Sequence, residues 1–259
     1  MVSADAVASL IIFVVVMGLF YFGLLNYQGI YVIGGLTTIL VTLFIAFAFS
    51  QFRPQTIQRQ QLILRRRYWP YYVLTVLSGA RRQIFVVFAA FLMVKRFQFS
   101  LTQMAALFLV TQVISLWLGP IIGRLVAHIG ERRALFVENA GLVFVFLGYA
   151  FVQHVTIAAS LFVVDNLLFA MAIALKSYFK KIADPADIAA TSGVSSTINH
   201  IAAVIIPITF GPLWLVSPSW IFVFGACLAA VSLSFTLVIP HDAKPGQEHI
   251  FKIVPILSE

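Results

Sequence analysis

Two adjacent arginines, Arg81 and Arg82, interrupt an otherwise apolar stretch of the sequence, with YWPYYVLTVL before them and VVFAAFLMV after them. The stretch is long enough to cross a bilayer. A charge at the centre of a spanning helix costs about 2.5–3.5 kcal/mol on insertion scales. Two guanidinium groups at that depth therefore indicate a polar interior, in which a carboxylate, a bound anion or both compensate their charge.

Two further ionisable side chains fall at a similar depth in other apolar stretches. With a helical rise of about 1.5 Å per residue, Arg81 and His200 lie roughly 16 Å and 18 Å in from the cytoplasmic face of the membrane. Asp165 lies roughly 14 Å in from the opposite face by the same rise. We expect these three residues to occupy one central layer, and Glu138 to lie about one turn inside the cytoplasmic boundary of the membrane. The charges of Arg81, Arg82, Glu138 and Asp165 add to zero.

Neighbouring residues of a helix point about 100° apart, so the two arginines are not expected to share one partner. One is expected to pair with Asp165, and the other to face a cavity. A buried ion network without substrate contact is the alternative. Glu138 is expected to brace Arg132 or Arg124 beside a basic turn, and His200 is either a site residue or a neutral histidine in a helix contact.

The apolar run at 188–214 has the clearest start and the most polar face. DPAD supplies a capping Asp184, Pro185 in the first position and Asp187 in the first turn. Polar residues then recur at spacings of three and four, which places them in one stripe along the helix: Ser192, Ser195, Ser196, Asn199 and His200. Such a stripe lines a cavity or packs on a neighbouring helix, and its extension to Asn199 and His200 favours a cavity.

The composition is that of an integral membrane protein. The 259 residues are 61% hydrophobic and 10% charged, and their mean hydropathy is +1.01. Long continuous apolar runs without strand alternation predict an all-α protein with about eight transmembrane helices. The expected spans are about 6–25, 29–50, 70–94, 103–127, 134–153, 156–178, 188–214 and 219–240.

The net charge of +8 reflects membrane topology rather than nucleic-acid binding. Most basic residues lie on one set of alternating connections or in the tail, and only Lys95 and Arg96 lie on the other set. By the positive-inside rule both termini are expected in the cytoplasm, with contact to anionic lipid at that surface. The basic residues on the cytoplasmic side are Arg53, Arg59, Arg65, Arg66, Arg67, Arg124, Arg132, Arg133, Lys176, Lys180, Lys181, Lys244 and Lys252.

No enzyme motif is found in the sequence. The metalloprotease HExxH, CxxC, the GxSxG elbow and the Walker loop are all absent, and the five histidines show no metal-ligand spacing. We therefore expect no catalysis, cofactor or metal site. The single cysteine, Cys227, lies inside the last expected span and cannot form an intrachain disulfide.

One connection resembles the cytoplasmic signature loop of the major facilitator superfamily. In GPIIGRLVAHIGERRAL, Gly123, Gly130 and Arg132 match that signature, while Ala127, His128 and Glu131 depart from it. Degenerate copies of this kind are usual in the second half of the family. Gly119 and Gly123 also form a GxxxG that permits close helix contact. The resemblance makes Gly123, Gly130, Arg132 and Glu138 candidates for a structural gating loop.

The layout of the chain supports this resemblance. A basic linker at 51–69 separates two helices at 1–50 from six at 70–240, and 241–259 form a tail. The signature lies between the second and third helices of the six, as in the family's second lobe. Residues 1–50 would then be the last two helices of a first lobe whose other four helices are unaccounted for. A second lobe or self-association is therefore an expected partner, beside the substrate and membrane lipid.

The resemblance implies secondary transport of a small solute across the bacterial inner membrane by alternating access. It also implies a coupling proton, which Asp165, or His200 as second candidate, would take up and release. Substrate or proton-pathway candidates are Arg81, Arg82, Asp165, Asn199 and His200. The alternative is a non-transporting membrane subunit or scaffold that retains only the architecture of the lobe.

Overall fold

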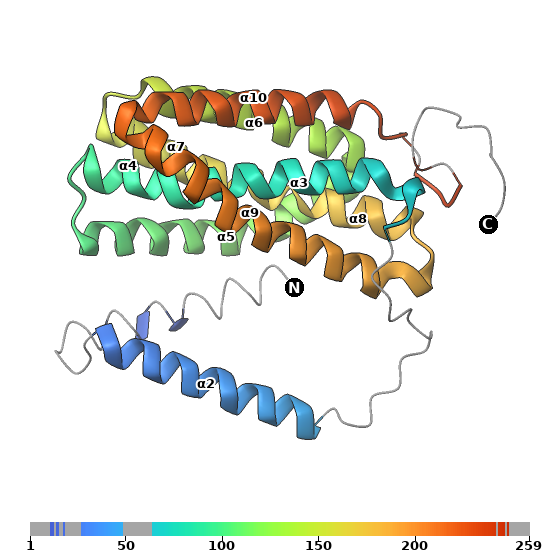
Figure 1. The fold of residues 1–259 in the computed structure, drawn as a ribbon, viewed down its shortest axis with the longest axis horizontal. Helices are drawn as coiled ribbons and strands as arrows, with labels where there is room; N and C mark the ends of the chain where they lie inside the picture. Colours follow the sequence, from blue (N-terminus) through green and yellow to red (C-terminus); the bar gives the residue numbers. More distant parts are fainter. Residues whose placement is uncertain are drawn as a thin grey trace.

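A computed structural model describes residues 11, 12, 14, 15, 18, 27–48, 64–241, 243–246 and 248 (Figure 1). Every regular element of three or more residues within these ranges is a helix, which confirms the predicted all-α class. The helices are α2 (Tyr27–Ala48), α3 (Trp69–Gln83), α4 (Ala90–Lys95), α5 (Leu101–Ile129), α6 (Glu131–Phe151), α7 (Val155–Ala170), α8 (Ile173–Ile182), α9 (Ile188–Val216) and α10 (Pro218–Thr236). Short 3₁₀ turns at Arg66–Tyr68 and Pro185–Asp187 precede α3 and α9.

Seven helical segments in the described parts are long and apolar enough to cross a membrane. They coincide with seven of the eight expected spans, and the first expected span, 6–25, lies mostly outside the described residues. The expected span at 188–214, for example, is α9 at Ile188–Val216. The chain is therefore a multi-pass membrane protein.

Two of the spans are not single regular helices. The span Arg66–Lys95 contains a π-helical segment, Ile84–Ala89, which begins two residues after Arg82. The span Val155–Ile182 is broken at Met171 and Ala172, where α7 ends and α8 begins. π turns and broken spans are frequent at functional sites of membrane proteins.

Local chemistry fixes the turns at the ends of the spans. Asp184 caps the start of the α9 span as predicted, because its side chain accepts a hydrogen bond from the Ala186 amide at 3.0 Å. Gly130 alone connects α5 to α6, and its φ of 84° is a conformation that favours glycine. The Gly130 amide also donates to the Val126 carbonyl at 3.0 Å, which closes the last turn of α5.

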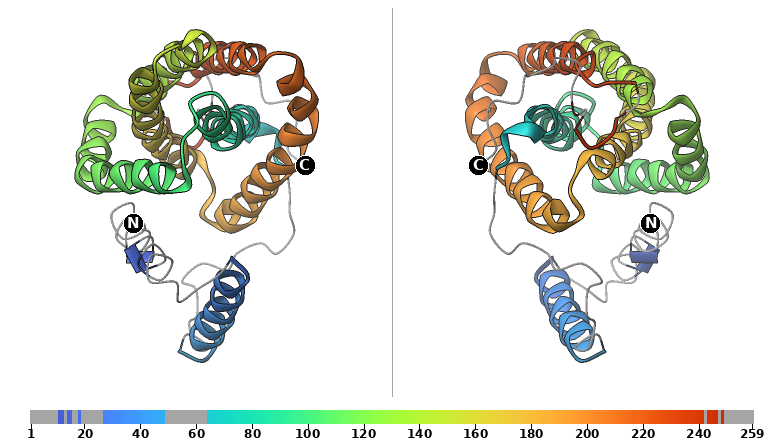
Figure 2. Two further views of the ribbon diagram at one scale, coloured as in Figure 1. Left: turned by 90° about the vertical axis from the view of Figure 1, so that its left-hand side faces the viewer. Right: turned by 90° about the vertical axis from the view of Figure 1, so that its right-hand side faces the viewer.

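The six spans from α3 to α10 pack into one bundle, with α3 near its middle (Figure 2). Helices α6 and α10 run side by side and form the most extensive helix pair. Gly225 of α10 permits this approach, since a Cβ at that position would lie 2.9 Å from the ring of Phe146. Tyr149 and Phe222 stack in the same interface with ring centroids 5.1 Å apart. The central position of α3 keeps part of its side chains away from lipid.

Candidate functional site

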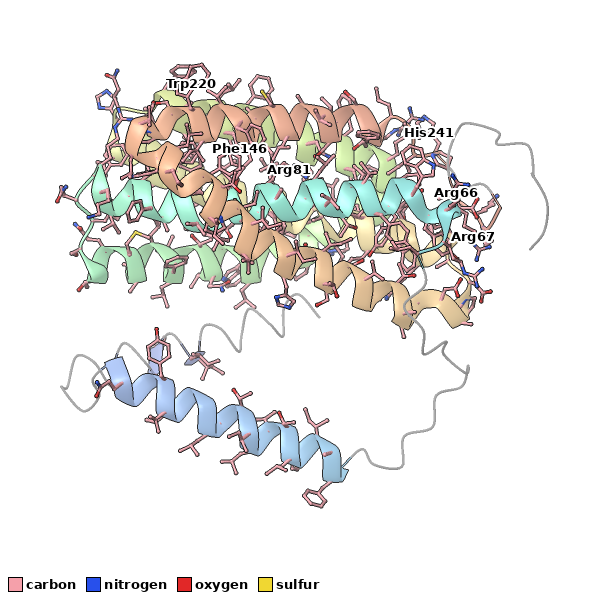
Figure 3. The ribbon with its side chains drawn as sticks, viewed as in Figure 1. Arg66, Arg67, Arg81, Phe146, Trp220 and His241 are labelled. Atoms are coloured by element: carbon pink, nitrogen blue, oxygen red, sulfur yellow. The ribbon has the colours of Figure 1, made fainter. Side chains whose placement is uncertain are left out.

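Arg81 lies inside the bundle, at the middle of the span that contains α3 (Figure 3). Its side chain is 3% exposed, and its Nη2 lies 3.7 Å from Oε1 of Glu138 on α6. Its Nε donates to the Leu77 carbonyl of its own helix at 3.3 Å. Glu138 is 1% exposed, so the two charges form an ion pair that is shielded from solvent and lipid alike.

This pair corrects the expectation for Glu138, which does not brace Arg132 or Arg124 among the described residues. Glu138 is seven residues into α6 and Arg81 twelve residues into α3, so their backbones differ in depth by roughly 7–8 Å. The two helices run in the same direction. A long helical side chain leans toward the N-terminus of its helix, so Arg81 reaches back along α3 to the level of Glu138.

Asp165 of α7 completes the group of buried charges. It is 1% exposed. Within the described part of the chain it forms no direct ion pair, contrary to expectation, but it interacts electrostatically with both Arg81 and Arg82. We call Arg81, Arg82, Glu138 and Asp165 the buried charge cluster.

The buried charge cluster is incompletely hydrogen-bonded. Three of its buried atoms have no hydrogen-bond partner among the described residues: Nη1 of Arg81, Oε2 of Glu138 and Oδ1 of Asp165. The hydroxyl of Tyr149, which interacts electrostatically with Asp165, also has none there. Unpartnered polar atoms in a buried site cost free energy, and in native proteins they often mark a redox or catalytic role or an unseen water or ion.

Arg82 has a different environment from Arg81. Its side chain is half-buried, and its Nη1 donates to Oδ1 of Asn166 at 3.3 Å. Its guanidinium carbon lies 4.4 Å from the ring centroid of Phe169, within the range of a cation–π contact. The two arginines therefore have separate direct partners, Glu138 and Asn166, as their 100° offset predicts, although both interact electrostatically with Asp165.

The polar stripe of α9 lies on an open face of the bundle. Ser192, Ser196, Asn199 and His200 are exposed, while the Ser195 hydroxyl lies 2.7 Å from the hydroxyl of Tyr71 on α3. Asn199 also approaches α3, since a Cβ at Gly79 would lie 2.6 Å from its Oδ1. The structure thus brings Asn199 beside the helix of the arginines, and it shows no contact between His200 and the buried charge cluster within the described ranges.

A groove with a volume of about 680 Å³ runs between α3, the end of α7, α8 and α9. Its polar lining comes from three faces: Ser78, Thr75 and Tyr71 of α3, Ser195 and Asn199 of α9, and Ser177, Lys176 and Lys180 of α8. Phe169 contributes to an apolar wall. We call this cavity the α3–α8–α9 groove.

The predicted gating turn is held by a residue that departs from the family signature. The carboxylate of Glu131 lies 2.7 Å from Nζ of Lys181 and accepts from the Ser177 hydroxyl at 2.8 Å, which ties the start of α6 to α8. Gly123 makes no close helix contact, contrary to expectation, since a Cβ there would meet no described atom within 4 Å. Arg132 is half-buried beside the turn.

A second charge cluster lies at the same end of the bundle. Oδ2 of Asp187 lies 2.5 Å from Nε of Arg65 and 3.4 Å from Nη2 of Arg67, and it accepts from the Tyr68 hydroxyl at 3.2 Å. The Tyr68 hydroxyl accepts in turn from the Asp184 amide at 3.0 Å. We call Arg65, Arg67, Tyr68 and Asp187 the terminal charge cluster. The contacts of this cluster connect the residues before α3 to the start of α9.

Sequence reasoning missed several residues of these sites. Asn166 follows Asp165 directly, and an amide inside a span is itself a signal of a buried polar contact. Lys176 and Lys180 were read only as topology residues, although their spacing of four places them on one face of a helix. Among the described residues, no group of three or more His, Cys, Asp or Glu side chains is placed to hold a metal ion.

Comparison with known proteins gives one match. The family model described as Major Facilitator Superfamily matches residues 1–207, which is most of the chain. No curated protein matches the chain, and no solved structure does.

Proposed function

Because the chain belongs to the major facilitator superfamily, whose members are membrane transporters, we propose that it acts in proton-coupled secondary transport of a small solute. Alternating access is the proposed mechanism, in which helix bundles rock about a site between them. The open polar face of α9 supports this, because Ser192, Ser196 and His200 are unfavourable against lipid and suit a water-filled path or another bundle. A second lobe or a second copy of the chain would supply that bundle.

The observation that carries the proposal is the buried charge cluster. Carboxyl groups exchange protons in proteins, whereas arginine stays protonated, so Glu138 and Asp165 are its proton-binding groups. With both acids ionised, the cluster of two arginines and two carboxylates is neutral. When Asp165 binds a proton, the cluster gains one positive charge, and this changes the field that the site presents to a solute. Such coupling between charge states is the role of buried ionisable groups in pumps and transporters.

We assign the proton to Asp165 rather than to Glu138. Glu138 has a direct ion pair with Arg81, and loss of its charge would leave that guanidinium group buried without a partner. Asp165 has no direct ion pair among the described residues, and its Oδ1 has no hydrogen-bond partner there. His200 is the second candidate, on the open face of α9.

The test is proton uptake by proteoliposomes that contain the full chain and an internal pH-sensitive dye, with a panel of solutes added under an imposed pH gradient. We expect solute-dependent uptake in the wild type and its loss in Asp165→Asn. Asp184→Asn is the matched control, because it makes the same change at a helix cap, where asparagine caps as well as aspartate. Wild-type proton uptake by Asp165→Asn would contradict the assignment.

The orientation in the bacterial inner membrane is part of the same proposal, with both termini in the cytoplasm. Its support is the excess of basic residues on alternate connections. On a background with Cys227→Ser, a cysteine at His128 should react with an impermeant maleimide only from the cytoplasmic side. One at Pro218 should react only from outside, and reversed labelling would overturn the orientation.

A further inference from the structure

We infer that the α3–α8–α9 groove binds an amphipathic organic anion, with the anionic group held by Lys176 and Lys180 and the apolar body lying along Phe169. This inference rests on the proposed transport function, because it names the class of solute that the site takes. The groove has the size of a small-molecule site, with a mostly apolar surface and polar groups contributed by α3, α8 and α9.

The charge of the groove favours an anion. Lys176 and Lys180 line it, and neither has an ion-pair partner among the described residues, whereas the neighbouring Lys181 pairs with Glu131. Among the residues that the structure describes, no aspartate or glutamate lines the groove. The two lysines are one helical turn apart on α8, so both ammonium groups can approach one anionic group. The groove thus presents two positive charges and no compensating negative charge.

Polar groups farther along the groove can add hydrogen bonds. The Ser78 hydroxyl and the Asn199 side chain both line it, and neither makes a hydrogen bond within the described part of the chain. By contrast, Thr75 donates to the Tyr71 carbonyl at 2.7 Å, so its hydroxyl proton is already committed. Ser78 and Asn199 therefore remain free to contact a ligand between α3 and α9.

Phe169 connects the groove to the buried charge cluster. It lines the groove, and its ring centroid lies 4.4 Å from the guanidinium carbon of Arg82. The two lysines therefore line the groove itself, while the guanidinium group of Arg82 lies against the ring of its lining residue Phe169. An amphipathic anion enters at the lysines and meets the field of Arg82 as it moves inward.

Two sources could supply an anionic group on an apolar body: a transported solute, or an anionic phospholipid whose head group occupies a basic pocket between helices. The experiment separates them. The full chain is placed in nanodiscs of phosphatidylcholine alone or with phosphatidylglycerol. Binding of naphthalene-2-sulfonate is then measured by equilibrium dialysis, with the neutral naphthalene-2-sulfonamide as the matched probe.

We expect the sulfonate to bind the wild type and the sulfonamide to bind at least tenfold more weakly. Lys176→Gln/Lys180→Gln should weaken sulfonate binding roughly 30-fold, since each lysine near an anionic group contributes about a fivefold factor. Lys176→Arg/Lys180→Arg should retain it. Arg124→Gln/Arg133→Gln is the control, because it removes two exposed charges from the same end of the bundle that do not line the groove. Competition by phosphatidylglycerol would identify lipid as an occupant of the same site.

Equal binding of sulfonate and sulfonamide by the wild type would overturn the inference, and this comparison does not depend on any variant folding. Unchanged sulfonate binding by the glutamine pair would overturn it too. Binding is measured without a pH gradient, so it does not depend on proton transport. Asp165→Asn should therefore still bind the sulfonate in this assay although it takes up no protons in proteoliposomes. If the wild type binds the anion but shows no proton uptake, the binding inference stands and proton-coupled transport is refuted. If solute-dependent proton uptake is the same in the wild type and in Lys176→Gln/Lys180→Gln, the assignment of the groove as the anion site is refuted and the transport proposal is not.

Discussion

The two charge clusters of this molecule contain the same kinds of group in different surroundings. In the terminal charge cluster, one carboxylate oxygen of Asp187 is within reach of Arg65, Arg67 and Tyr68, and the arginines remain partly exposed. In the buried charge cluster, two carboxylates and two guanidinium groups share one ion pair of 3.7 Å, and three of their buried atoms have no hydrogen-bond partner among the described residues.

We propose that this difference separates a structural contact from a functional site. A carboxylate surrounded by donors is fixed in one charge state and one position, which suits a contact that holds two segments together. A carboxylate such as Asp165 has charges nearby but no direct ion-pair partner among the described residues, so it loses no ion pair there when it gains a proton or when its neighbours move. The proposed proton-binding role of Asp165 agrees with this incomplete pairing.

The largest expected effect is from Arg81→Ala. Removing one partner of a buried ion pair leaves Glu138 uncompensated, and we expect a loss of about 3–5 kcal/mol of stability. The double variant Arg81→Ala/Glu138→Ala should lose less than the sum of the two single losses. Thermal unfolding of detergent-solubilised protein measures all three. Additive losses would show that Arg81 and Glu138 are not coupled, and Asp165 would then be the partner to test.

Substitution in the terminal charge cluster should cost less stability than Arg81→Ala, and the cost should depend on salt concentration. Asp187→Ala should cost about 1–2 kcal/mol, since hydrogen bonds to a charged group are lost where solvent can replace them. In 1 M salt this cost should shrink, because partly exposed charges are screened, whereas the Arg81→Ala cost should not change. Equal salt dependence at the two clusters would remove the distinction between them.

A smaller effect is expected at the contact between Glu131 and Lys181. The Lys181 side chain is 52% exposed, so Glu131→Gln should cost about 0.5 kcal/mol in the same unfolding assay. The amide can still accept from the Ser177 hydroxyl, which limits the loss. A cost above that of Asp187→Ala would make this turn, rather than the segment before α3, the main fastening at this end of the bundle.

The smallest effect is expected for Arg132→Ala. This variant tests whether Glu138 interacts with Arg132, the partner expected from the sequence. Because Glu138 pairs with Arg81, removal of Arg132 should change stability by less than about 0.5 kcal/mol. Combining it with Glu138→Ala in a double-mutant cycle should give no coupling. Measurable coupling would restore the role that the sequence suggested for Arg132.

The comparison also explains what could be predicted from the sequence. Apolar length located the described spans to within a few residues, and the DPAD stretch predicted the start of α9, because both depend on local chemistry. The partner of Arg81 depends on the relative depth and direction of α3 and α6 and on the reach of an arginine side chain. Counting from span ends places Glu138 near the cytoplasmic surface and therefore assigns it to Arg132 or Arg124 rather than to Arg81.

Irregularities inside the spans were beyond sequence reasoning for a related reason. Neither the π-helical segment Ile84–Ala89 nor the break at Met171 and Ala172 contains a proline or glycine. Both conformations are therefore set by packing in the bundle. The α3–α8–α9 groove could not be predicted either, because it requires α8 to begin at that break and turn its lysines toward α3 and α9.

The one-residue connection at Gly130 has a mechanical consequence. Only Gly130 separates α5 from α6, so a tilt of α6 relative to α5 would pivot at Gly130. Along the axis of α6, Glu138 lies roughly 12 Å and Phe151 roughly 30 Å from Gly130. A tilt of about 10° would displace Glu138 by about 2 Å and Phe151 by about 5 Å by the same helical geometry. Such a tilt would therefore move Glu138 less than half as far as the far end of α6.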